Sequence, residues 1–367
     1  MTAAKSAMAA SAMHAALLAV ACMFGASTAM AQEPYYKGKR LTIMVNYAAG
    51  GPTDIEGRLF ARNIVRHLAG SPNVVVQNMD GAGGLIGTNW LGEIAPKDGT
   101  AMGYLTGASW LYASEPTKYR VDFLTYDFVA YQPGTSIYYV RTDVAPGIKV
   151  SADLMKAKGL VSGGLSADNS KDLLMRLALD MLGLQYRHVT GYRSNNTARM
   201  ALQQNEISFF SESPPGYRSV VEPSLVKNGQ VIPTWYDPGW NGESFAVPRQ
   251  VEGLTIPPFH EYFQSVKGTK PSGQLWDVYL TSLAINGAMQ RMLVLPPGVP
   301  QAALDELRAA VRKLNNDAAF AEEARKVIGF VPEYAAGPET NRQVRSALAV
   351  KPEIRAFVAD YIKSANK

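Results

Sequence analysis

The sequence predicts an α/β protein with two domains. Short apolar segments repeatedly lead through turns of small polar residues into amphipathic helices, an alternation typical of largely parallel sheets flanked by helices. The chain has 367 residues, and at about 150 residues per domain this length favours two separate cores. The formal net charge is only +5, and the basic residues are dispersed. This argues against nucleic-acid binding and fits a small anionic ligand better.

The first strand-to-helix junction, residues 41–54, predicts an anion site. Its alternating apolar residues indicate a strand, and Gly50 with Gly51 allows the backbone to approach a ligand closely. Thr53 and Glu56 have the spacing of a capping box, which predicts a helix that begins there. The N–H groups and positive dipole end of a helix start favour a carboxylate or phosphate. A tight turn with no ligand fits the same residues about equally well.

The N-terminal residues 1–31 are predicted to be a secretory signal peptide. Lys5 precedes an apolar stretch, and Ala29-Met30-Ala31 forms a small-x-small cleavage site, so we expect cleavage after Ala31 and a soluble periplasmic protein. Cys22 lies inside this segment, where lipidation is the less favoured alternative. The expected mature chain therefore contains no cysteine, which excludes disulfides and thiolate chemistry from it.

Further alternations continue along the chain. Helix 55–68, strand 74–76 and an apolar segment at 102–105 complete the first set, and we expect its strand ends to face one crevice. The second set is predicted as strand 136–141, helix 151–157, strand 159–162, helix 170–182, strand 186–189, helix 195–204 and strand 207–210. Residues 212–275 are predicted to form ordered loops with short elements, and residues 301–328 are predicted to be helical.

Nucleotide binding and catalysis have little support. The glycine-rich segment 81–87 does not have the G-x-G-x-x-G spacing, because Ile86 stands at the third glycine position. His67, His188 and His260 form no metal-binding or nucleophile-base motif, and structural roles are favoured for them. We therefore expect no catalytic residue, no metal and no cofactor.

Several motifs together resemble the substrate-binding proteins of tripartite tricarboxylate transporters, also called the Bug family. The resemblance follows the expected mature chain in order. Its motifs are Y-A-A-G-G-P-T-D at 47–54, V-V-V-Q-N-M-D-G-A-G-G-L-I-G-T-N at 74–89, A-P-K-D-G-T at 95–100, S-G-G-L-S-A-D-N-S-K-D-L at 162–173, V-T-G-Y-R-S-N-N-T-A-R at 189–199 and L-P-P-G-V-P at 295–300.

This resemblance implies a periplasmic-binding-protein-like (Venus flytrap) fold with a ligand cleft between two α/β domains. We expect residues 32–135 plus 292–367 to form domain 1 and residues 136–291 to form domain 2. The implied partners are a small organic acid and the membrane permease subunits of a tripartite transporter, and the protein is expected to be a monomer. The implied ligand-binding residues are Ala49, Gly50, Gly51, Thr53, Asp54, Gly107, Ala108, Ser109, Trp110, Gly164, Ser166, Ser170, Tyr192, Arg193 and Ser194.

The chain departs from the family pattern at two places. Asp172 stands where many members have a histidine, and Arg193 lies in a segment where many have a Pro-Tyr-Lys-Gly-like run. We expect Arg193 to pair with a second ligand carboxylate, the alternative being a surface cation. Trp110 and Tyr192 could form an aromatic wall, and a core position for Trp110 is nearly as well supported. A sensor for a membrane kinase, or less favourably a secreted enzyme acting on organic acids, remains an alternative function.

Overall fold

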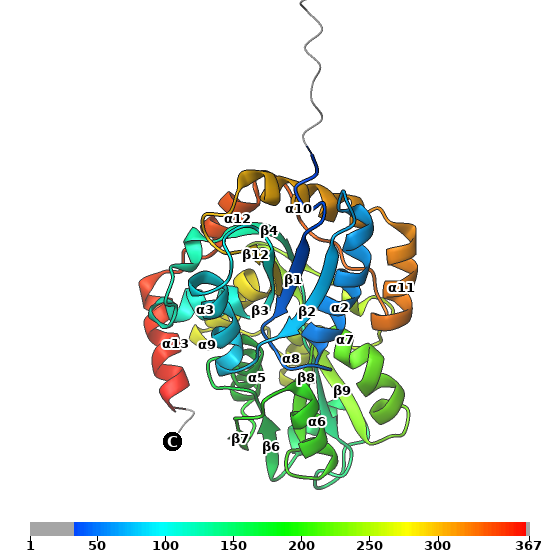
Figure 1. Ribbon diagram of the computed structural model, residues 1–367. Helices are drawn as coiled ribbons and strands as arrows, with labels where there is room; N and C mark the ends of the chain where they lie inside the picture. The colour runs from blue at the N-terminus through cyan, green and yellow to red at the C-terminus, as the bar shows by residue number, and fades with distance from the viewer. Residues whose placement is uncertain (1–32, 365–367) are drawn as a thin grey trace, which may run out of the picture. The chain divides into compact units, whose positions relative to one another are not determined.

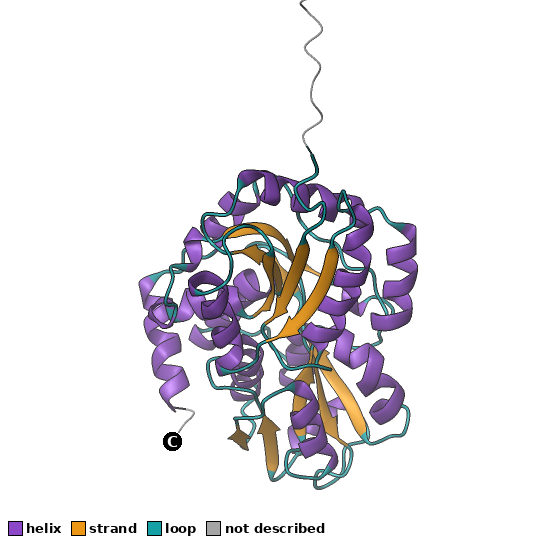
Figure 2. Cartoon of the chain, in the orientation of Figure 1, coloured by secondary structure: helices purple, strands orange, loops and turns teal. Residues whose placement is uncertain are grey.

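The computed structural model describes residues 33–364, so the predicted signal peptide, its cleavage site and Cys22 lie outside the described residues. The strands form two five-stranded mixed sheets and one short hairpin, and Figure 2 shows the two larger groups of strands with helices around them. The alternation of short strands and helices confirms the predicted α/β class.

The first sheet has the strand order β2-β1-β3-β12-β4. Strands β1, β2 and β3 are parallel, and β12 runs antiparallel to both β3 and β4. A strand from late in the sequence is thereby inserted between two early ones (Figure 1). The bounds are β1 (Arg40–Val45), β2 (Asn73–Asn78), β3 (Ala101–Thr106), β4 (Asp127–Gln132) and β12 (Arg291–Leu295).

The second sheet has the order β7-β6-β8-β5-β9, in which β6 is parallel to β7 and β8, and β5 is antiparallel to β8 and β9. Its strands are β5 (Ile137–Arg141), β6 (Leu160–Gly163), β7 (Tyr186–Val189), β8 (Phe209–Glu212) and β9 (Val231–Tyr236). Strand β9 lies in the region predicted as ordered loops with short elements. Its pairing with β5 depends on residues almost a hundred positions away, which local sequence patterns do not reveal.

Helices cover both sheets (Figure 1). In β1, the alternate residues Leu41, Ile43 and Val45 share a buried apolar cluster with Phe60 of α2 (Pro52–Ile64) and Leu307 of α10 (Gln301–Leu314). This agrees with the two-residue period of a strand. The α-helices are α2 (Pro52–Ile64), α3 (Leu85–Glu93), α4 (Ala108–Ser114), α5 (Ser170–Met181), α6 (Asn195–Gln203), α7 (Pro214–Gly216), α8 (Phe259–Lys267), α9 (Gln274–Ser282), α10 (Gln301–Leu314), α11 (Ala318–Ile328), α12 (Thr340–Ala347) and α13 (Pro352–Ser364).

Two chain segments connect the sheets. Residues 133–136 lead from β4 to β5, and residues 288–290 lead into β12. The two segments are held together, since Gln290 Nε2 donates to Thr135 O at 3.0 Å. Just before the second segment, Gly287 O accepts from Gly134 N at 2.8 Å. A Cβ atom at Gly134 would lie 2.0 Å from Gln290 Oε1, so this close approach requires glycine. The crossing places the start of β12 beside the ends of the other strands.

Candidate functional site

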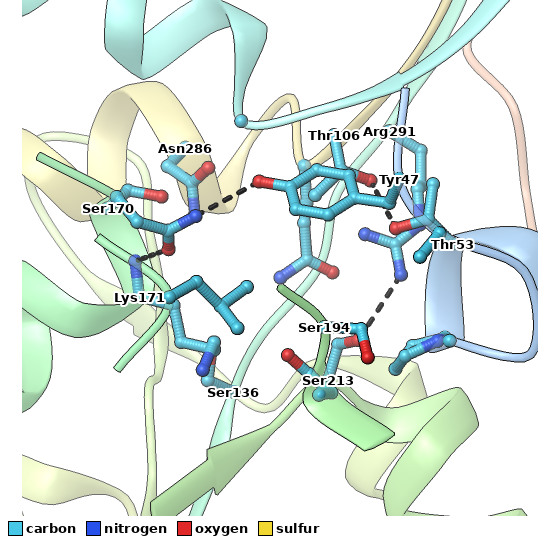
Figure 3. A pocket seen from close by; sticks show the side chains of 18 residues that line it. Tyr47, Thr53, Thr106, Ser136, Ser170, Lys171, Ser194, Ser213, Asn286 and Arg291 are labelled. Carbon is cyan, nitrogen blue, oxygen red and sulfur yellow. Dashed lines mark hydrogen bonds between the residues drawn. The ribbon is translucent and has the colours of Figure 1, made fainter. Parts of the chain in front are cut away.

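A cavity of about 50 Å³ lies where strand ends and helix starts that belong to both sheets meet (Figure 3). Its lining is rich in hydroxyl and amide side chains. Among the described residues that line it, two are cations and none is Asp or Glu. The lining residues are Tyr47, Ala48, Gly51, Pro52, Thr53, Thr106, Gly107, Ser136, Leu165, Asn169, Ser170, Lys171, Ser194, Asn195, Ser213, Asn286, Gln290 and Arg291.

Three helices of nine or more residues begin at this cavity. The N-cap positions of α2, α5 and α6 are Gly51, Asn169 and Ser194, and all three line it. Asn169 Oδ1 accepts from Lys171 N at 3.1 Å, and Ser194 Oγ accepts from Thr197 N at 3.2 Å. Each helix start contributes a partial positive charge, so three of them converging on one cavity favour an anionic occupant.

The more deeply buried of the two cations in the lining is Arg291, at the start of β12. Only 1% of its surface is exposed. Its Nε donates to Glu56 Oε2 at 2.7 Å, and Gln132 Nε2 donates to the other oxygen of Glu56 at 2.6 Å. Arg291 Nη2 lies 3.3 Å from Ser213 Oγ, a contact drawn in Figure 3. Glu56 and Arg291 are thus a buried ion pair with one edge of the guanidinium turned to the cavity lining.

Arg291 Nη1 has no hydrogen-bond partner among residues 33–364. Buried polar atoms in native proteins are almost always hydrogen-bonded, because losing hydration without a replacement bond costs about 1–3 kcal/mol and more for a charged group. Arg291 Nη1 is therefore a charged donor that the described chain leaves unsatisfied, and carboxylate oxygens are the partners that a guanidinium prefers.

Lys171 is the second cation of the lining and differs from Arg291 because its ammonium is already engaged. Its Nζ donates to Ser211 O at 3.1 Å and to Ser211 Oγ at 3.2 Å, and lies 3.2 Å from Asp172 Oδ1. Asp172 Oδ2 accepts from the backbone N–H groups of Leu165 and Ser166 at 2.5 and 3.0 Å. Lys171 contributes positive charge, and Asp172 fixes the loop before α5.

Tyr47 also lines the cavity, and Figure 3 draws a hydrogen bond at its hydroxyl. Its hydroxyl donates to Gly83 O at 2.9 Å and accepts from Asn169 Nδ2 at 3.0 Å. Burial, followed by the nearby Asp172 carboxylate, raises the pKa of Tyr47 well above its usual value, so the hydroxyl stays neutral. The Tyr47–Asn169 contact joins the segment after β1 to the start of α5 over the cavity.

Asp54 belongs to the scaffold of the first junction and does not line the cavity. Its Oδ2 accepts from Gly50 N at 2.8 Å and from Arg58 Nε at 3.0 Å, and Asn78 Nδ2 donates to Oδ1 at 2.9 Å. Burial alone would raise the pKa of Asp54, but these hydrogen bonds outweigh it and lower the pKa below its usual value. The carboxylate therefore holds the turn in shape as an anion.

The prediction of a capping box at Thr53 and Glu56 is wrong. Helix α2 begins at Pro52 with Gly51 as N-cap and no side-chain cap. Thr53 Oγ1 instead lies 3.0 Å from Thr106 Oγ1, and Glu56 binds Arg291. The buried ion pair competes successfully for Glu56 because the cap would leave Arg291 without its counter-charge.

Of the predicted ligand-binding residues, the structure brings Gly51, Thr53, Gly107, Ser170 and Ser194 to the cavity. The side chain of Arg193 is 83% exposed, and its Nη2 lies 3.9 Å from Asp80 Oδ2. Arg193 is therefore placed as a surface cation, which was the alternative to a ligand contact. Trp110 is 1% exposed and belongs to the main apolar core, so the aromatic wall is not formed by it. The other predicted residues outside the lining are Ala49, Gly50, Asp54, Ala108, Ser109, Gly164, Ser166 and Tyr192.

Sequence reasoning missed Arg291, Asn286 and Ser213. Arg291 directly precedes the apolar run of β12, where a cation at a buried strand start is unusual. This feature is visible in the sequence. The ion pair is not, because Glu56, the partner of Arg291, lies 235 positions earlier in the chain. The three histidines lie outside the lining, and His188 Nδ1 is 2.8 Å from Ser162 Oγ within the second sheet.

Comparisons with known proteins give relatives in sequence, while no family model matches the chain. A UPF0065 protein in the TAR-I ttuE-ttuC' intergenic region of Agrobacterium vitis is 32% identical over 163 residues, which cover 42% of this chain and 45% of that protein. A UPF0065 protein in the gbd 5' region of Cupriavidus necator is 25% identical over 223 residues, which cover 57% and 63%. The match thus spans about half the length of these curated relatives.

Solved structures resemble this chain over most of its length. The periplasmic binding protein BugD aligns at a TM-score of 0.65 with 18% identity, covering 89% of this chain and 98% of that one. MatC from Rhodopseudomonas palustris, with bound malate, aligns at 0.61 with 16% identity over 88% and 99%. An R. palustris protein with adipate aligns at 0.64 with 17% identity over 89% and 97%. These likenesses confirm the predicted periplasmic-binding-protein-like fold.

Proposed function

The comparisons support the tripartite tricarboxylate transporter substrate-binding protein family, and from this premise we propose that the protein captures a small organic carboxylate for a transporter of that type. The relatives share the fold and, in two structures, hold malate or adipate. A carboxylate ligand for this chain is supported independently by the cavity, whose charged lining is entirely cationic within the described part of the chain.

The observation that carries the proposal is the unpaired Nη1 of Arg291. The ion pair with Glu56 holds the guanidinium in place, so little side-chain entropy remains to be lost when a ligand binds. A carboxylate oxygen at Nη1 would complete the hydrogen bonding of a buried charged group, and the starts of α2, α5 and α6 would stabilise the same negative charge.

A binding role rather than catalysis is supported by the chemistry of the lining. Its serine and threonine hydroxyls have no histidine beside them in the cavity, and the described residues contain no group of three metal-ligating side chains. An activated nucleophile needs a base within hydrogen-bonding reach. We therefore propose that the protein releases its ligand unchanged.

Ligand capture is proposed to involve the two-domain division expected from the sequence, residues 32–135 plus 292–367 and residues 136–291. The cavity draws residues from both ranges, and the hydrogen-bonded crossings at 133–136 and 288–290 are the natural hinge. Closure would exclude water and so strengthen the attraction between the cations and the carboxylate.

The partners and location are part of the same proposal. We propose that the mature protein is a periplasmic monomer and that its closed form binds the permease subunits of a tripartite tricarboxylate transporter. None of the helices within residues 33–364 is long and apolar enough to cross a membrane.

The proposal is tested by measuring thermal unfolding and binding heats with mono-, di- and tricarboxylates beside their primary amides. A ligand at 100 times its dissociation constant should stabilise the folded protein by about 2.7 kcal/mol. We expect at least one acid to do so, while its amide does not because it lacks the charge that Arg291 pairs with. Equal stabilisation by acid and amide, or by no acid at all, would contradict carboxylate capture.

A further inference from the structure

An ion pair beside the cavity joins the two proposed domains. Lys118 is the last residue of the 3₁₀-helix Pro116–Lys118, between α4 and β4, and Asp168 lies in the loop between β6 and α5. Lys118 Nζ donates to Asp168 Oδ2 at 2.6 Å and to Glu115 Oε1 at 3.0 Å. Since Lys118 belongs to residues 32–135 and Asp168 to residues 136–291, the pair crosses the proposed division of the chain.

The pair lies at the edge of a small hollow that adjoins the cavity. This hollow shares Gly107, Asn169 and Ser170 with the cavity and is also lined by Gly83, Leu111 and Asp168. The side chains of Lys118 and Asp168 are 38% and 20% exposed, so the pair is reached by solvent. The described lining of the hollow includes no residue of the crossings at 133–136 and 288–290, so the pair lies apart from the proposed hinge.

Asp168 is fixed by its own loop before Lys118 reaches it. Ser166 Oγ donates to Asp168 Oδ1 at 2.5 Å, which leaves Oδ2 for Lys118. Burial alone would raise the pKa of Asp168, but the hydrogen bonds from Lys118 and Ser166 outweigh it and lower the pKa below its usual value. The carboxylate is therefore charged at neutral pH.

The loop that carries Asp168 also meets two other segments of the first domain. Asn169 Nδ2 donates to the Tyr47 hydroxyl at 3.0 Å. A Cβ atom at Gly83 would lie 3.4 Å from Ser166 Oγ, which shows how closely the glycine-rich segment approaches the same loop. Three separate parts of the first domain thus converge on residues 166–169 of the second.

The ion pair also affects the charge beside the cavity. The Asp168 carboxylate lines the adjoining hollow, where it would repel an anion in the cavity. Lys118 offsets this charge only when the two loops are together. The arrangement that brings Lys118 to Asp168 is therefore also the one in which a bound carboxylate is repelled least.

We propose that Lys118 and Asp168 form a latch, which holds the two domains closed around the cavity when the ion pair forms and frees them to open when it breaks. The Tyr47–Asn169 hydrogen bond is the neutral part of the same contact. This inference rests on the proposed function, because the latch serves to retain a captured carboxylate, and it names positioning residues that act on domain closure.

The test is the distance between two spin labels, one on each domain, measured by double electron–electron resonance. The expected mature chain has no cysteine of its own, so labels can be attached at Ile94→Cys on α3 and Met200→Cys on α6, whose native side chains are 65% and 55% exposed. Measurements without acid, with succinate and with citrate give the ratio of the closed separation, as in the structure, to longer ones.

Lys118→Met should lower the closed-to-open ratio about two- to five-fold, the effect of a partly exposed ion pair. Asp168→Asn should lower it by a similar factor, and the double variant should lower it little further, because the two residues act through one contact. Arg193→Met is the matched control. It removes one positive charge from a pair that also crosses the division, but this pair is long and the Arg193 side chain is 83% exposed, so the ratio should change less than about two-fold.

An unchanged ratio in Lys118→Met, or full addition of the two losses in the double variant, would overturn the latch. A closed separation that is populated under none of the three conditions would overturn it as well. Carboxylate capture would stand in each case if an acid still stabilises the protein against thermal unfolding. Conversely, failure of every acid to bind would overturn the proposed function, while the label distances without acid would still decide whether the ion pair controls closure.

Discussion

Replacement of Arg291 by methionine should weaken both binding and folding, for separable reasons. Arg291 and Glu56 are each 1% exposed, so the variant leaves the Glu56 carboxylate buried without its counter-charge. Removing one partner of a buried ion pair typically costs about 3–5 kcal/mol of stability. Loss of the guanidinium should also cost about 2–5 kcal/mol of carboxylate binding, since the ligand charge then lacks its partner.

The double variant Glu56→Leu with Arg291→Met separates the two effects. Replacing both members of a buried ion pair by apolar residues is often neutral or stabilising. The double variant should therefore regain most of the unfolding free energy that Arg291→Met loses. A part should stay lost, because the amide of Gln132 no longer has Glu56 as acceptor. Carboxylate binding should not recover. Urea unfolding measures the first quantity and titration calorimetry the second.

Arg308→Met is the matched control. Arg308 is buried at 6% exposure and donates to Phe128 O, but it does not line the cavity. This variant should lose stability and retain its affinity. If Arg291→Met binds carboxylates as the unmodified protein does, the reasoning about Nη1 is refuted.

The remaining predictions concern the first junction, the surface arginine and pH. Gly51 lines the cavity with φ −80°, and a Cβ there would lie 3.4 Å from Ala48 O. Gly51→Leu should therefore fold, but its side chain should lower the carboxylate affinity measured by calorimetry at least about ten-fold. Unchanged affinity would show that the start of α2 is not part of the site. Arg193→Ala should change affinity for mono- and diacids by less than about 1 kcal/mol, because the side chain is 83% exposed; a selective loss of diacid binding would restore Arg193 to the site. Burial raises the pKa of Asp237 to about 7 despite hydrogen bonds from Tyr279 and Tyr138. The folded state then holds a proton that the unfolded state releases near pH 4, so urea unfolding should show stability falling by up to roughly 4 kcal/mol from pH 4 to 7. Asp237→Asn should flatten this slope, and an unchanged slope would exclude Asp237 as its cause.

Local patterns were sufficient to predict much of the fold. Strand 186–189 and the start of helix 170–182 agree with β7 and α5, because alternation and capping are encoded in neighbouring residues. Helix 301–328 is interrupted, since Asp317 caps a second helix with its own side chain. Residues 151–157, predicted as a helix, form a 3₁₀-helix over Ser151–Lys156.

The candidate site was predictable only in part. Gly51, Thr53 and Gly107 stand in recognisable strand-to-helix turns, and Ser170 and Ser194 stand at helix starts. Arg291 and Asn286 come to the cavity through the return of the chain into β12, a long-range pairing with β3 and β4 that has no local sequence signature. Arg193 lies in the expected loop, but its side chain faces solvent.

A crystal structure of the protein with a bound carboxylic acid tests the central claim most directly. The account predicts a carboxylate oxygen about 2.7–2.9 Å from Arg291 Nη1, the distance of a charge-assisted hydrogen bond, inside the cavity that Tyr47 and Asn169 adjoin. A carboxylate held only by backbone N–H groups, with Arg291 Nη1 bonded to water, would contradict it.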